Sequence, residues 1–349
     1  MKYHLDFDRR SSCYSSLIAC LVALAAMVAP SFAQASPWVL PKGKSVLSIK
    51  GGTDFASREF LIDDRREQRF PLRGRFESYS LQLAGRYGLF EDVEIGTRVT
   101  LKNVAYISDP VILASPDDAT NPCTPDNATF QGCRERNTNF SSSDFGFSDI
   151  YFNLVMQHIG GSARAASNLE IKVPTGYTEP GETFQDGEVD PLSIVDDVAL
   201  GDGRVHLQYK LETGWFISSS GTVLELAGGY RARLGAPGDQ VLGEVKIGQN
   251  IGRRLFFFIS ADAALTIFEG RVLGQTFVSN RPNTPALEFT GDDVERRDFR
   301  LDNSFARATA GVIVRLNGRE VVISASQIFA GENIPRLTSI NFGAILPFQ

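Results

Sequence analysis

Apolar and polar residues alternate along most of the chain, as in the segment RVHLQYKLE at 204–212. There Val205, Leu207, Tyr209 and Leu211 take every second position, and polar or charged residues take the others. Because successive side chains of a strand point to opposite faces, this pattern predicts a strand with one apolar and one charged face. A soluble sandwich would bury the apolar face against protein, whereas an outer-membrane barrel would turn it to lipid and enclose the charged face.

Similar segments recur along the chain, and no convincing amphipathic helix interrupts them. We expect twelve strands, at 45–55, 76–88, 93–106, 145–159, 165–177, 204–217, 222–234, 240–251, 255–268, 299–316, 320–329 and 337–348. Most exceed the roughly five or six residues usual in soluble sheets, and they match the roughly 9–11 residues that a tilted strand needs to cross a bilayer.

The connections between these segments alternate in length. Short turns with sequences such as GGSAR, SSSG and NGR are typical of hairpins. The connections between them include four long polar loops, at 56–75, 107–144, 178–203 and 269–298. Loops beyond about 12–15 residues are uncommon in compact soluble domains. The sequence therefore predicts an all-β transmembrane barrel, antiparallel and up-and-down, with about 12 strands, short periplasmic turns, long extracellular loops and both termini on the periplasmic side.

Residues 1–33 are predicted to be a secretory signal peptide, and 34–349 the barrel. Arg9 and Arg10 precede the apolar run LIACLVALAAMVA, and the small residues SFAQA follow it, which places cleavage after Ala33 or Ala35. The run is shorter than the roughly 20 residues of a membrane-spanning helix.

The final strand has an apolar face that ends at Phe348, followed by Gln349. Such strands resemble the signal read by the outer-membrane assembly machinery. We therefore expect a bacterial outer-membrane protein, whose partners are outer-membrane lipid and that machinery.

Charge and cysteines refine this picture. The net charge of −6 argues against a nucleic-acid partner, which usually requires a basic face. Cys123 and Cys133 lie among turn-forming residues in NPCTPDNATFQGC, which predicts a disulfide that pins a loop of an exported protein. A metal site is the alternative, but no histidine lies nearby.

The charged faces are assigned to the lumen, because an Arg or Lys facing lipid at the bilayer midplane costs about 2–4 kcal/mol. The candidate residues for contact with a solute are Arg98, Lys102, Asp149, Glu170, Lys172, Arg204, His206, Lys210, Glu212, Glu225, Arg231, Arg233, Glu244, Lys246 and Asp262. The basic cluster Arg204, Arg231 and Arg233 is the first candidate for attracting an anionic solute. The structural alternative is a cross-strand network of this cluster with Glu212 and Glu225.

Enzymatic chemistry has little support in the sequence. A barrel hydrolase would need a histidine with Ser or Asp partners, and after the signal the chain contains only His158 and His206, with no serine motif beside them. The acidic loops lack the spacing of an EF-hand. The sequence predicts no catalytic residue, cofactor or metal.

Three phrases resemble those of a known family. The runs SLQLAGRYGLFEDVEIG, FGFSDIYFNLVMQHI and LEIKVPTGY are similar to the meta-pathway phenol-degradation-like outer-membrane proteins and to a related group of uncharacterised barrels. The resemblance covers mainly 76–252 and implies a channel or transporter for small, often aromatic or hydrophobic compounds. It transfers no solute-binding residue, because the phrases mark turns and strand ends. The expected function is a channel for small solutes through a charged lumen; the alternatives are a non-conducting barrel with functional surface loops and an outer-membrane hydrolase.

Overall fold

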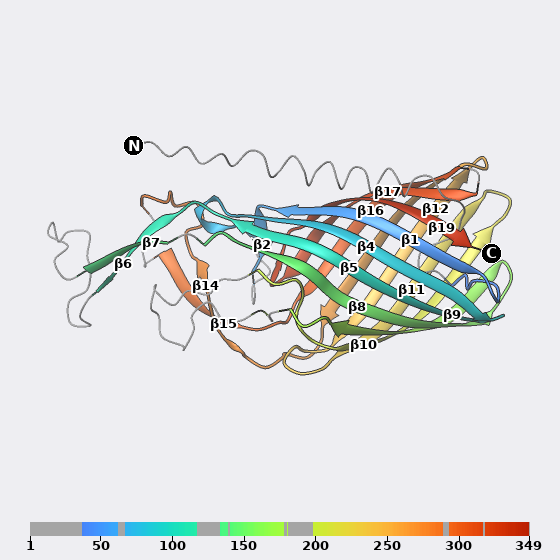
Figure 1. Ribbon diagram of the computed structural model, residues 1–349, viewed down its shortest axis with the longest axis horizontal. Helices are drawn as coiled ribbons and strands as arrows, with labels where there is room; N and C mark the ends of the chain where they lie inside the picture. Colours follow the sequence, from blue (N-terminus) through green and yellow to red (C-terminus); the bar gives the residue numbers. More distant parts are fainter. Residues whose placement is uncertain are drawn as a thin grey trace.

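Twelve strands close into one antiparallel barrel (Figure 1). The computed structural model describes residues 37–61, 67–116, 133–138, 140–177, 180, 198–288, 293–316 and 318–348. The barrel strands are β1 (Ser45–Ala56), β4 (Arg75–Phe90), β5 (Val93–Ile107), β8 (Ser142–Ile159), β9 (Ala163–Pro174), β10 (His206–Ile217), β11 (Thr222–Arg233), β12 (Gln240–Ile251), β13 (Leu255–Thr266), β16 (Ser304–Leu316), β17 (Arg319–Glu332) and β19 (Thr338–Phe348). Each pairs with its sequence neighbour in the wall, and β19 pairs with β1 to close it. The predicted fold class is confirmed.

Both ends of the barrel sheet lie at the end that carries the short turns. Ser45, the first residue of β1, pairs with Phe348 in β19 and with Tyr87 in β4. The turns at this end are tight, and Gly221 and Gly252 adopt positive φ values of 70° and 63° there, a region that glycine enters without steric strain. The expected periplasmic placement of the two ends of the sheet fits this arrangement.

The sequence predicts no strands in the long extracellular loops, but the structure shows several. Short strands in these loops pair locally beyond the barrel rim, at the end opposite the short turns (Figure 1). These strands are β2 (Arg58–Phe60), β3 (Glu67–Arg69), β6 (Val111–Pro116), β7 (Cys133–Thr138), β14 (Gly274–Ser279) and β15 (Val294–Phe299). A further short strand, β18 (Ile334–Pro335), lies in the short connection between β17 and β19 and pairs with β2. A chain that runs out and back satisfies its own backbone groups most directly by antiparallel pairing.

Several barrel strands are shorter at the extracellular end than predicted, and two differ by three residues or more. The strand expected at 165–177 ends at Pro174, which has no N–H to continue the ladder. The strand expected at 299–316 begins at Ser304, because Phe299 ends β15 of the loop hairpin instead.

The outer wall of the barrel is apolar. In β10, Leu207, Tyr209 and Leu211 are exposed, whereas Gln208 and Glu212 are buried inside. Ile259, in the middle of β13, is the most exposed example on the barrel strands at 68%. No helix of the described residues is long and apolar enough to cross a membrane. A closed sheet with an apolar outer belt is the arrangement of a transmembrane barrel.

Candidate functional site

The barrel encloses a chamber of about 510 Å³. Its walls carry both charged and aromatic side chains, including Arg98, Arg231, Glu170 and Tyr151. It lies between the short-turn mouth and the extracellular rim, and segments outside the barrel strands reach into the lumen at both ends. The residues that hold these segments decide what can enter the chamber.

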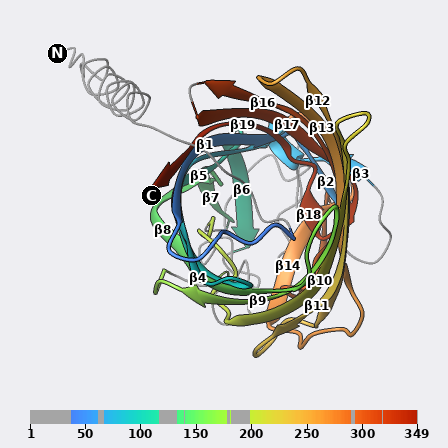
Figure 2. The same cartoon turned by 90° about the vertical axis from the view of Figure 1, so that its right-hand side faces the viewer.

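At the periplasmic mouth, residues 37–44 cross the lumen ahead of β1 (Figure 2). Val39 packs against Val155 and Ala166, on β8 and β9. Leu40, the next residue, packs against the opposite wall. Its cluster comprises Val46, Phe256, Phe258, Ile313, Val322 and Ile345. Two adjacent side chains that reach opposite walls place this segment across the diameter of the lumen, and we call it the mouth segment.

Glu94 anchors the mouth segment. Its side chain is fully buried, and one carboxylate oxygen accepts a hydrogen bond from the Leu40 backbone N–H at 2.9 Å. Arg86 pairs with both oxygens of the same carboxylate, with Nη2 at 2.7 Å from Oε2. The guanidinium and the amide together supply the partners that a buried carboxylate requires.

The mouth segment also fits tightly against two glycines. A Cβ on Gly88 would lie 2.2 Å from the Pro41 carbonyl oxygen, and one on Gly214 would lie 2.6 Å from the Trp38 ring. Any side chain at either position would displace the segment. The sequence analysis missed this feature because PWVLP shows no alternation; its only signal is an apolar run between two prolines immediately before the first strand.

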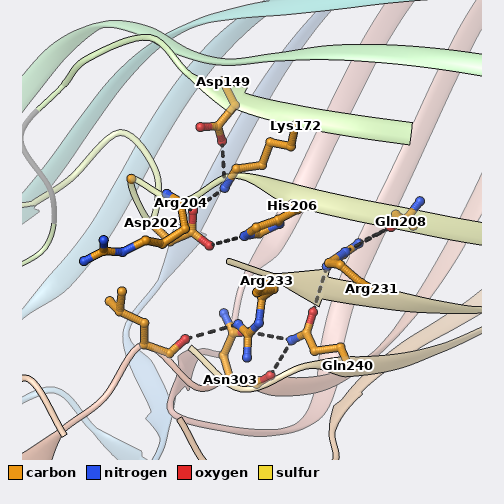
Figure 3. A network of polar contacts seen from close by, with 12 residues as sticks. Asp149, Lys172, Asp202, Arg204, His206, Gln208, Arg231, Arg233, Gln240 and Asn303 are labelled. Atoms are coloured by element: carbon orange, nitrogen blue, oxygen red, sulfur yellow. Dashed lines mark hydrogen bonds and ion pairs between the residues drawn. The ribbon is translucent and has the colours of Figure 1, made fainter. Parts of the chain in front are cut away.

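At the extracellular end, an ionic cluster draws residues 198–205 inward (Figure 3). Asp202 forms an ion pair with Lys172 and a hydrogen bond with the His206 ring at 2.7 Å. Lys172 also approaches Asp149 at 3.4 Å, and the Tyr177 hydroxyl donates to Asp149 at 2.6 Å. Asp202 is therefore shared between a cation and an imidazole of the wall.

The same segment inserts a leucine into the barrel. Leu200 is only 3% exposed. Its carbonyl accepts hydrogen bonds from the Ser148 hydroxyl at 2.8 Å and from the Lys102 ammonium at 3.4 Å. We call 198–205 the outer segment.

Ionisation in this cluster follows from its surroundings. Burial by itself raises the pKa of Asp202, but the hydrogen bond and charge of His206 and the charge of Lys172 lower it more, so its net pKa lies well below the ordinary value. Burial raises the pKa of Tyr177, and the hydrogen bond to Asp149 raises it further. Asp202 therefore remains an anion at neutral pH, and Tyr177 remains a neutral donor.

A second cluster holds residues 300–303 inward. Asp302 accepts hydrogen bonds from the backbone N–H groups of Gly238 and Gly270 at 2.6 and 2.7 Å. Arg233 reaches the same carboxylate at 3.4 Å and the Gly238 carbonyl at 2.5 Å. Gln240 and Asn303 add a further hydrogen bond beside it (Figure 3).

Several predicted lumen residues form ion pairs, two of them between neighbouring strands and two across one intervening strand. These pairs are Arg98–Glu170 at 3.2 Å, Lys246–Glu225 at 3.0 Å, Arg307–Asp262 at 3.0 Å and Lys210–Glu244 at 3.6 Å. Glu212 instead accepts a hydrogen bond from the Asn168 amide at 3.0 Å.

The hydrogen bonds of the basic cluster in the described part of the chain go to partners other than Glu212 and Glu225. Arg231 donates to the side-chain oxygens of Gln208 and Gln240 instead, at 2.7 and 2.8 Å. Arg233 turns to Asp302, and the Arg204 backbone N–H donates to Asp202 at 3.1 Å. Arg231 binds amides because glutamines lie opposite it on both neighbouring strands. Arg233 and Arg204 bind Asp302 and Asp202, which lie in segments outside the barrel strands.

The structure also adds residues that the sequence analysis did not single out. Lys50 of β1 lines the chamber, but the following Gly51 and Gly52 obscure the alternation of its strand. Asp202 and Asp302 lie in loops, where alternation gives no signal.

The remaining predictions concern a hydrolase site, a disulfide and a signal peptide. Among the described residues, the recorded hydrogen bond of the His206 ring is to Asp202, and no serine hydroxyl joins this pair. Cys123 lies outside the described residues, as does the predicted signal peptide, and the Cys133 side chain is likewise not described. The disulfide and the signal peptide stay predictions.

Three solved structures are similar to this chain to different degrees. An outer-membrane channel from Pseudomonas putida F1 matches with a TM-score of 0.58 and 9% identity, over 91% of this chain and 100% of that one. The translocator domain of the autotransporter NalP from Neisseria meningitidis has a TM-score of 0.38 at 10% identity, over 98% of each chain. The monoaromatic hydrocarbon channel CymD has a TM-score of 0.37 at 8% identity, over 88% of each chain.

No family model matches the chain, and no curated protein matches its sequence. The first structure shares the barrel fold, whereas the other two are only loosely similar. This is an outer-membrane β-barrel. The shared closed barrel and the apolar outer wall place the chain in the bacterial outer membrane, as predicted.

The anchoring role of Glu94 predicts the exposure of Trp38. In a Trp215→Phe background, Trp38 is the sole tryptophan, and we expect weak quenching of its fluorescence by acrylamide. Glu94→Gln removes the charge from hydrogen bonds worth about 1.5–3 kcal/mol each, so quenching should rise toward that of a solvent-exposed indole. Glu91→Gln, in the exposed turn at the same mouth, is the control. Equal quenching in both variants would contradict the anchor.

The lowered pKa of Asp202 predicts how stability depends on pH. A carboxylate with a lowered folded pKa stabilises the fold above its ordinary pKa of about 3.9, and this stabilisation is lost as the pH falls through the lowered value. We expect Asp202→Asn to reduce the free energy of unfolding by about 1.5–3 kcal/mol, undiminished from pH 8 to pH 5 and shrinking only at more acidic pH.

The measurement is the unfolding midpoint of the detergent-solubilised barrel at several pH values. Asp92→Asn, in an exposed periplasmic turn, is the matched control and should change little. A difference for Asp202→Asn that disappears between pH 7 and pH 5 would show that Asp202 does not keep its charge in this range.

Proposed function

We propose that the protein is a passive channel for small solutes, with a chamber closed at each end by a displaceable segment. The observation that carries this proposal is the charged chamber between the mouth segment and the outer segment. A barrel that served only as a scaffold would gain nothing from a chamber of about 510 Å³ lined with charges. Charged walls are compatible with water and polar solutes, and opposed charges orient them.

The mouth segment and the outer segment obstruct the lumen in a different way from the wall side chains that fill a small barrel. Small barrels fill their lumen with wall side chains, which cannot leave without unfolding the wall. Here the obstruction comes from residues 37–44 and 198–205, which lie outside the barrel strands. Their contacts are hydrogen bonds, ion pairs and apolar packing, so each segment can leave the lumen while the wall stays intact.

The finer assignment rests on sequence resemblance. The phrases in 76–252 that resemble the phenol-degradation-like outer-membrane proteins support a place for this chain among small-solute channels. The channel from Pseudomonas putida F1 shares the barrel fold, which is compatible with this assignment. The alternative, a non-conducting barrel whose loops bind a partner, is favoured by the two closures if they never open.

Planar-bilayer recording separates these functions. We expect single-channel steps for the wild-type chain and a larger conductance for the double variant Trp38→Ala/Leu40→Ala, because the truncated mouth segment loses its packing on both walls. Trp215→Ala, a truncation on the lipid-facing side of β10, is the control and should conduct like the wild type. A protein that inserts but does not conduct, even with the mouth segment truncated, would favour the non-conducting barrel.

A further inference from the structure

The chamber wall carries more cations than anions. Seven basic side chains and four acidic ones line it. The basic ones are Lys50, Arg86, Arg98, Lys210, Arg231, Lys246 and Arg307; the acidic ones are Glu94, Glu170, Glu244 and Asp262. Four of the basic residues pair with these four acids, and Lys246 pairs with Glu225 of the neighbouring strand.

Lys50 and Arg231 are the two cations without a carboxylate partner. Among the described residues, no acidic group lies within ion-pair distance of either. Their cross-strand neighbours explain this, because Lys50 lies opposite Gln82 and Gly343, and Arg231 lies between Gln208 and Gln240.

Elsewhere in the wall, charges are matched across the ladder. Arg307 lies opposite Asp262, and Lys246 lies opposite Glu225. The same sheet therefore places acids beside some cations and amides beside others. The register of the strands therefore fixes an excess of positive charge in the chamber, and this excess remains when the side chains change rotamer.

Arg98 connects the two unmatched cations. It repels both Lys50 and Arg231, and Arg307 also repels Lys50. Carboxylates attract both cations without pairing with them: Asp54 of the same strand attracts Lys50, and Glu170 and Asp202 attract Arg231. Like charges gathered in an enclosed space raise the local concentration of anions, and low-dielectric walls strengthen this effect. The chamber is therefore suited to a negatively charged solute.

Aromatic rings lie beside these cations. The Arg98 guanidinium stands 3.9 Å from the centre of the Tyr151 ring, and Lys246 and Arg307 each lie 5.7 Å from a phenylalanine ring, Phe258 and Phe305 respectively. Phe258 and Phe305 also line the chamber. The volume of about 510 Å³ falls within the roughly 300–1,000 Å³ of small-molecule sites.

We propose that this chamber binds small monocarboxylates with an aromatic body, with the carboxylate near Lys50, Arg98 and Arg231 and the ring against Tyr151, Phe258 or Phe305. This proposal names the solute class of the proposed channel, and its biological role therefore rests on that proposed function. Binding itself requires only the chamber. A carboxylate between cations forms charge-assisted hydrogen bonds, and the ring adds apolar contact.

Calorimetric titration of the full-length barrel in detergent tests the site, with benzoate as the probe and benzyl alcohol as its neutral counterpart. We expect benzoate to bind and benzyl alcohol to bind much more weakly. Lys50→Gln should weaken benzoate binding by about tenfold or more, which corresponds to about 1.4 kcal/mol, whereas Lys50→Arg should restore most of it. Arg253→Gln, in the exposed turn after β12, is the control and should bind like the wild type.

The outcomes distinguish the site from the channel. Absence of benzoate binding, equal binding of benzyl alcohol, or an unchanged affinity in Lys50→Gln would overturn the site even if the protein conducts. Benzoate binding that depends on Lys50, in a protein that never conducts, would support the site and reject the channel. Heat-modifiable migration on a gel verifies that each variant folds, and Arg231→Gln provides a second, independent removal of charge.

Discussion

Hydrocarbon offers no hydrogen-bond partner to a polypeptide backbone, so a sheet that crosses a membrane has to pair every strand. In this chain the β1–β19 ladder meets that demand by joining the first barrel strand to the last. Closure then divides the side chains of each strand between lipid and lumen. Leu207 and Leu211 lie on the outer side of β10, and Gln208 and Glu212 lie on the inner side. Charged side chains on the inner side avoid the cost of contact with hydrocarbon.

The enclosed charges do more than avoid lipid. Glu94 binds the backbone of the mouth segment, and Lys172 and Arg233 bind the carboxylates of Asp202 and Asp302 in segments that fold in from the rim. Wall charges at both ends therefore anchor the closures, whereas the middle of the lumen retains unmatched cations. The proposed closing and the proposed solute selectivity of the channel thus arise from one set of inward-facing positions.

Alternation and loop length were enough to predict the barrel, its twelve strands and its location, because lipid imposes a period of two on every strand. They were not enough for the closures. The mouth segment at 37–44 and the aspartates 202 and 302 have no periodic neighbours, and their positions depend on contacts with residues far away in the sequence. The partner of Arg233, Asp302, could not be predicted for the same reason. Gln208 and Gln240 lie opposite Arg231 on the neighbouring strands, but the strand register that brings them together cannot be read from alternation, and Lys50 was obscured by the two glycines that follow it.

The central claim is that one face of each strand meets hydrocarbon and the other meets water. Spin labels placed singly at 207–212 in β10, in reconstituted bilayers, test it through collisions with oxygen and with a water-soluble nickel complex. Labels at 207, 209 and 211 should favour oxygen, and labels at 208, 210 and 212 should favour nickel. Uniform accessibility along the strand, or protection of the odd positions from both reagents by another layer of protein, would contradict the account.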